Sequence, residues 1–201
     1  MLRRELIRTA ALAAAACAAS VQAQAQASIR PDPKPRLPPQ PGQGLAVEDA
    51  RSLQRAAQLS DVQIEVGRLG TEKSATPEVK QLAVSIAEDN ARFRRIVDEL
   101  AAAHRVELPQ REASDTKDRS LAALREGTGE AFDRAFLERQ LRLYPSTAEL
   151  YQTMASNSPD TSIARFGITA LAALRAHFES AKALGARFGL TAEVIEKSPQ
   201  Y

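Results

Sequence analysis

Four polar side chains fall on the apolar faces of predicted helices, and their types decide what chemistry the interior of this protein can support. At 100° per residue, the inward polar positions are Gln63, Asn90, Tyr144 and His177. One inward polar residue on each of four helices is the arrangement from which carboxylate-bridged metal centres are built in bundles. Here the four positions hold one histidine and no carboxylate, so they lack the ligands that hold a divalent metal tightly.

The sequence therefore predicts a hydrogen-bonded polar layer in the core, with no metal, cofactor or catalytic residue at these positions. An unpaired buried amide costs about 1–3 kcal/mol, so buried side chains of this kind normally find partners. Gln140 also faces inward and adds to the layer. The alternative is a metal-dependent oxidase or metal store that uses His177, Tyr144 and a nearby carboxylate. It requires Asp89 or Glu65 to rotate inward.

Other catalytic chemistry finds no support in the residues. The only cysteine, Cys17, precedes the predicted helices, and the chain offers no glycine-rich phosphate loop and no nucleophile–base pair. The second histidine, His104, lies near a predicted helix end, where interaction with the helix dipole accounts for it. We therefore expect a protein that is not a hydrolase, a thiol oxidoreductase or a nucleotide-dependent enzyme.

Four long helices and almost no strand must position these residues. Apolar residues recur with helical spacing over 47–73, 77–104, 130–155 and 161–187, and a short helical piece lies near 120–126. Thr76 and Pro77 form a strong start signal for the second helix, and Gly189 is a stop signal for the fourth. The pattern predicts an all-α, antiparallel four-helix bundle over residues 45–190, with a short extra helix between the second and third long helices and a C-terminal tail of residues 191–201.

Pro145 stands inside the third long helix, directly after the inward Tyr144. A mid-helix proline removes one backbone hydrogen bond and crowds the carbonyl of Leu141, at about 3 kcal/mol in an unadapted helix. A kink is expected there. The sequence leaves open whether that kink is merely tolerated or opens a pocket.

Residues 1–25 predict a secretory signal. The basic segment MLRRELIR precedes the apolar run TAALAAAACAA, and small residues predict cleavage after Ala23, Ala25 or Ala27. That run is too short to span a bilayer, and no later segment offers about 18 consecutive apolar residues, so no transmembrane helix is expected. Export predicts a periplasmic protein and leaves outer-membrane association open. Lipidation of Cys17 is the alternative, although the residues before it match a lipidation motif weakly.

Residues 26–44 predict a linker between the signal and the bundle. The segment SIRPDPKPRLPPQPGQG is dense in proline and lacks apolar periodicity, which favours a semi-rigid tether over a ligand for a proline-reading domain. The formal charge of +2 resides in the predicted signal, so the mature chain is neutral and offers no basic surface for nucleic acid. An envelope-tethered structural spacer is therefore one functional hypothesis.

Several segments resemble a bacterial envelope family, domain of unknown function 4142. They are QIEVGRLGTEKSATPEVKQLAVSIAEDNARF, LP at 108–109, GEAFDRAFLERQL and LAALRAHFESAKAL, and the resemblance covers about residues 54–184. It implies a ferritin-like four-helix bundle in an exported or outer-membrane-associated protein.

The resemblance also implies a metal site from which this chain departs. Family members commonly carry glutamate in place of Gln63 and histidine in place of Asn90 and Tyr144, whereas His177 matches. Ala172 stands where many members have a proline. These features favour a non-enzymatic periplasmic binding or envelope-stress module with a degenerate metal site. Its partner is an envelope component or a small ligand, and its oligomeric state is open.

Overall fold

The computed structural model describes residues 45–109 and 119–191, and the regular structure within them is α-helical throughout. Its helices are α1 (Val47–Lys73), α2 (Pro77–His104), α3 (Arg119–Glu126), α4 (Gly129–Asn157) and α5 (Thr161–Arg187). The four long helices and the short extra helix predicted from the sequence are confirmed, and α3 and α4 extend beyond their predicted ends by one or two residues. The predicted signal, the linker and nearly all of the C-terminal tail lie outside the described residues.

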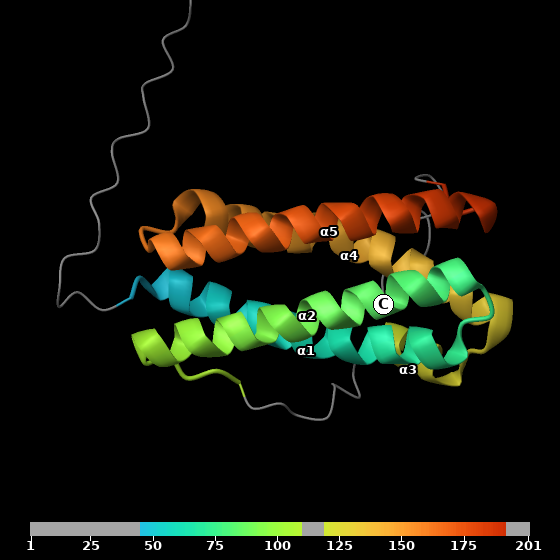
Figure 1. Ribbon diagram of the computed structural model, residues 1–201, viewed down its shortest axis with the longest axis horizontal. Helices are drawn as coiled ribbons and strands as arrows, with labels where there is room; N and C mark the ends of the chain where they lie inside the picture. Colours follow the sequence, from blue (N-terminus) through green and yellow to red (C-terminus); the bar gives the residue numbers. More distant parts are fainter. Residues whose placement is uncertain (1–44, 110–118, 192–201) are drawn as a thin grey trace, which may run out of the picture. The chain divides into compact units, whose positions relative to one another are not determined.

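The long helices form two hairpins, α1 with α2 and α4 with α5, which pack through α2 against α5 and through α1 against α4 (Figure 1). Contacts between helix ends fix the directions. His104, at the end of α2, lies 3.2 Å from Asp160, which precedes α5. Ser158, after the end of α4, donates a 2.8 Å hydrogen bond to Asp49 in the first turn of α1. Each helix is therefore antiparallel to both of its neighbours.

A consequence of these directions is that α2 and α4 run parallel, so the connection between them must return along the bundle. This connection carries α3, which packs on α1 and α4. Arg125 of α3 pairs with Glu65 of α1 at 2.7 Å. The predicted all-α four-helix bundle is confirmed, while its assignment to the ferritin-like class stays a prediction. No helix in the described ranges combines the length and apolar character needed to cross a membrane.

Two apolar clusters fill the interior, one toward each end of the bundle. Phe132 and Phe136, with ring centroids 6.0 Å apart, belong to the first cluster, near the start of α4. Phe93, Tyr151 and Phe166 belong to the second, where the rings meet edge to face at 5.8–6.5 Å. Such contacts add to the stabilisation that burial itself supplies, so each end of the bundle has its own rigid core.

The ends of α5 follow the signals in the sequence. The Asp160 side chain accepts two backbone N–H bonds from the first turn, at 2.8 and 3.0 Å. At the other end Gly189 has φ +69°, and the next residue, Leu190, donates its N–H to the Gly185 carbonyl at 2.9 Å. This helix end requires a residue with positive φ, and glycine adopts that conformation at little cost. The predicted stop at Gly189 is therefore confirmed.

Candidate functional site

The four predicted inward residues lie near the level at which the two apolar clusters meet. Asn90, for example, stands between Ile86 of the first cluster and Phe93 of the second. Gln63 and Asn90 are buried, with 5% and 6% of their surface exposed, whereas Tyr144 and His177 are half-buried. The four polar residues therefore lie at a similar height in the bundle, but each of them contacts a different partner.

Gln63 forms the buried polar contact between α1 and α4. Its Nε2 donates to Oε1 of Gln140 at 2.8 Å, and the reciprocal amide contact is 3.5 Å. Gln140 is itself only 8% exposed. Two amides that face each other satisfy a donor and an acceptor on each side, so these two side chains form a hydrogen-bonded pair in the core.

Asn90 and Tyr144 are engaged in other directions. Asn90 Nδ2 donates to the Ile86 carbonyl of its own helix at 2.8 Å. The Tyr144 ring stacks on Phe178, with centroids 4.0 Å apart and an interplanar angle of 24°, and so joins α4 to α5. The Asn90 contact therefore stays within α2, whereas the Tyr144 contact is part of the packing between α4 and α5.

His177 is the member of the set that meets a carboxylate. Its Nε2 lies 3.0 Å from Oδ2 of Asp89 on α2 and 3.4 Å from Oγ of Ser85, one turn earlier on the same helix. Asp89 also pairs with Arg92. The expectation that Asp89 must rotate inward to join His177 is wrong, because the carboxylate, with 18% of its side chain exposed, already reaches the ring at the edge of the α2–α5 contact.

A serine, a histidine and an aspartate meet at this site, but their atoms do not form a hydrolytic triad. Ser85 and Asp89 both approach the same ring nitrogen, Nε2 of His177. In a triad the aspartate binds one ring nitrogen and the other accepts the serine proton. A nitrogen that donates its hydrogen to a carboxylate cannot also act as a base. The cluster therefore works as a polar link between α2 and α5.

The same residues do not fit a transition-metal centre. Such centres in bundles gather several histidines and carboxylates at one point. Within residues 45–109 and 119–191, no three side chains of His, Cys, Asp or Glu are placed to hold an ion together. His177 and Asp89 supply only two candidate ligands, and their side chains contact each other at 3.0 Å.

Burial sets the protonation of the His177 ring. Removal from water lowers the pKa of His177 below its ordinary value of 6.5, and the Asp89 carboxylate, which acts in the opposite direction, offsets only part of this shift. The folded bundle therefore prefers the neutral imidazole, which donates through Nε2 to Asp89.

Acidification should weaken the bundle through His177. Because the pKa is lower in the folded than in the unfolded chain, the stability linked to this group is present above pH 6.5 and is lost as the pH falls toward the folded pKa. Urea unfolding of the wild type and of His177→Gln at about pH 7.5 and about pH 5.5 measures the effect. The wild type should lose more stability on acidification than the variant does. An equal loss in both proteins would contradict the assignment.

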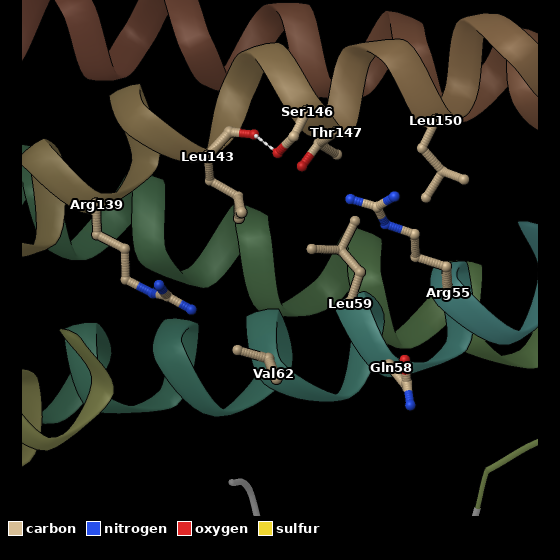
Figure 2. Close-up of a pocket in the computed structure, with 9 residues that line it drawn as sticks. All are labelled: Arg55, Gln58, Leu59, Val62, Arg139, Leu143, Ser146, Thr147 and Leu150. Carbon is tan, nitrogen blue, oxygen red and sulfur yellow. Dashed lines mark hydrogen bonds between the residues drawn. The ribbon is translucent and has the colours of Figure 1, made fainter. Parts of the chain in front are cut away.

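A pocket of about 230 Å³ lies between α1 and α4 beside Pro145 (Figure 2). Leu59 and Val62 of α1, with Leu143 and Leu150 of α4, give it an apolar wall. The question left open by the sequence is thus answered in part. α4 stays helical through Pro145, and the residues that follow it are small, so the facing helices leave a volume unfilled at this level.

The polar groups of the pocket come from both helices. Arg55 extends from α1 toward α4, and Arg139 points from α4 toward α1 (Figure 2). Thr147 is 4% exposed, and its hydroxyl faces the pocket. Ser146 lines the rim and donates to the Leu143 carbonyl at 3.2 Å. Sequence reasoning missed this site, although two small polar residues directly after a mid-helix proline were a usable signal.

Asp133 is a second residue that sequence reasoning missed. It lies in the segment FDRAFL, is fully buried, and accepts the Thr76 N–H through Oδ2 at 3.0 Å. Thr76 occupies the N-cap position of α2 without a side-chain cap of its own. The carboxylate from α4 therefore caps α2 from outside, where the positive end of the helix dipole favours it. The signal was an acidic residue directly after the core Phe132 and one helical turn before the core Phe136.

Two solved structures of other bacterial proteins are similar to this bundle. The structure is similar to a DUF305 fragment from Deinococcus radiodurans, with a TM-score of 0.62 and 16% identity over 72% of this chain and 99% of that one. It is also similar to a candidate spore coat protein from Bacillus halodurans, with a TM-score of 0.59 and 12% identity over 79% of this chain and 96% of that one. At such identities the likeness shows the helical fold alone.

The sequence comparisons identify the family. No curated protein sequence matches this chain. The sequence profile described as "Domain of unknown function (DUF4142)" matches residues 34–184, which include α1, α2, α4, all but the end of α5, and the candidate site. Since that match spans well over half of the 201 residues, the chain belongs to the DUF4142 family.

Proposed function

We propose that this DUF4142 protein is an exported, non-enzymatic binding module of the bacterial envelope that takes a small ligand between α1 and α4. The observation that carries the proposal is the pocket beside Pro145, which combines an apolar wall with polar groups from both helices. Helix interfaces normally pack without voids, because an unfilled volume costs stability. A volume retained between two long helices therefore favours a binding role over a purely structural one.

The N-terminal sequence supports the envelope setting. A basic segment, a short apolar run and small residues near Ala25 are typical of a cleaved export signal, and a proline-rich linker follows. Intact mass of the protein isolated from periplasm tests this part. Cleavage after Ala23, Ala25 or Ala27 is expected, whereas a chain that begins with a diacylated Cys17 would favour the envelope-tethered spacer instead.

Ligand binding is tested with hexanoate, hexan-1-ol and hexylamine as probes. At least one of them should shift backbone amide resonances of α1 and α4 around the pocket and raise the melting temperature of the mature protein. The Ser146→Phe variant places a ring at the pocket rim and should reduce the response. A wild-type protein that responds to none of the probes would overturn the proposal.

A metal-dependent oxidase or metal store is the alternative, and it would require the 3.0 Å contact between His177 and Asp89 to open so that both side chains could bind the ion. We expect metal well below stoichiometry in protein purified from periplasm, because three of the four inward positions are Gln63, Asn90 and Tyr144. Elemental analysis for iron, manganese, zinc and copper decides between the candidates. Stoichiometric metal that disappears in both His177→Ala and Tyr144→Phe would establish the metal protein, and Asp89 would be the next ligand to replace.

A further inference from the structure

The pocket between α1 and α4 has an unbalanced set of charges. Its polar lining includes two arginines, Arg55 and Arg139, and no acidic residue. Arg139 already has an interaction partner, so the positive charge that bears on the pocket is that of Arg55. Positive charge without acidic neighbours in the lining favours an anionic guest.

Arg55 is the arginine whose charge is available to a ligand. It is exposed, it lies on the rim, and its guanidinium reaches across the groove toward α4 (Figure 2). Among the described residues no ion pair or hydrogen bond engages its side chain. A guanidinium presents several N–H donors in a planar fork, which matches the two oxygens of a carboxylate.

Thr147 provides an independent sign of a ligand. A threonine inside a helix commonly bonds the carbonyl four residues earlier, here that of Leu143. That carbonyl instead accepts from Ser146 at 3.2 Å. The Thr147 hydroxyl has no hydrogen-bond partner in the part of the chain that the structure describes, although the residue is only 4% exposed and the hydroxyl faces the pocket. A ligand oxygen at this position would satisfy it.

We infer that the pocket binds a short-chain aliphatic carboxylate. The carboxylate binds Arg55 and takes the Thr147 hydroxyl as a second donor, while the chain lies on the apolar wall formed by Leu59 and Leu143. A volume of about 230 Å³ suits a chain of a few carbons. An inorganic anion would leave the apolar wall in water, and a cation would face the positive charge of Arg55. This inference rests on the proposed binding function and adds the chemical class of the ligand.

Titration of the full mature protein with hexanoate, followed by amide chemical shifts, tests the inference. Hexanoate should bind about tenfold more tightly than hexan-1-ol, which has the same chain without the charge, and hexylamine should bind most weakly. Arg55→Gln should weaken hexanoate about tenfold and leave hexan-1-ol unchanged. Arg68→Gln removes the same charge from an exposed position on another face of α1 and should leave both affinities unchanged.

Thr147 is tested separately, because its variants alter a buried position. Thr147→Val keeps the shape but removes the hydroxyl and should weaken hexanoate about fivefold, whereas Thr147→Ser should retain most of the affinity. Melting curves confirm that each variant is folded before it is titrated.

The outcomes separate the two proposals. Equal affinity for hexanoate and hexan-1-ol would overturn the carboxylate assignment while the binding function stands. Equal losses in Arg55→Gln and Arg68→Gln would show that hexanoate responds only to net charge, and this result would overturn the assigned site. Failure of every probe to bind would remove both the site and the binding function.

Discussion

Replacing Gly167 by valine should destabilise the bundle by about 3 kcal/mol or more. Gly167 on α5 is buried where this helix comes closest to α4. A Cβ atom there would lie 2.5 Å from the backbone N of Ala155 and 2.8 Å from the carbonyl oxygen of Tyr151. Backbone atoms of a helix cannot turn aside as a side chain can, so α5 would have to move away from α4. The edge-to-face contact between Tyr151 and Phe166 would open with it.

Gly185→Ala is the matched control on the same helix. A Cβ at Gly185 would meet Cδ1 of Leu141 at 3.3 Å and Cβ of Leu190 at 3.4 Å, which are side-chain atoms. The better helix propensity of alanine, about 1 kcal/mol, offsets this mild crowding, so the stability of Gly185→Ala should stay within about 1 kcal/mol of the wild type. Urea unfolding of both variants measures the contrast. A Gly167→Val protein as stable as the wild type would refute the close approach of α4 and α5.

Replacing Asp133 by alanine should cost about 2–3 kcal/mol, the second largest effect that we expect. The substitution removes the acceptor of the Thr76 N–H and leaves this donor without its partner at the start of α2. It also removes a negative charge from the positive end of the helix. Because Asp133 is fully buried, water cannot readily take its place.

Two further variants show which part of the Asp133 interaction matters. Asp133→Asn keeps an oxygen acceptor and removes the charge, so it should cost about 1 kcal/mol, less than alanine. Glu149→Ala, on an exposed position of the same helix, should change stability by less than about 0.5 kcal/mol. Equal stability of Asp133→Ala and Glu149→Ala in urea unfolding would contradict the capping role.

Much of the helical framework could be predicted from the sequence because its determinants are local. Apolar spacing identifies the buried face of each helix. Start and stop signals such as Pro77 and Gly189 act on the backbone within one turn, which is why α2 begins and α5 ends where the sequence predicts. The inward placement of Gln63 and Asn90 follows from the same periodicity, since every side chain on the apolar arc of a helix faces the core.

The candidate site depended on relations between helices that periodicity does not contain. The angle of a residue on its own helix says that His177 points inward, but the register between α2 and α5 decides that Asp89 and Ser85 both meet Nε2. The same holds for Asp133, whose partner Thr76 lies 57 positions away.

The pocket shows the division most clearly. The sequence by itself determined that Pro145 interrupts the backbone hydrogen bonds of a long helix, and that Ser146 and Thr147 after it are small. Only the tertiary structure decided that Arg55 of α1 faces this point and that a volume remains between the helices. The physical reason is that a cavity belongs to two surfaces at once. Its size and charge are set by how far apart packing holds those surfaces, and no property of either segment alone specifies that distance.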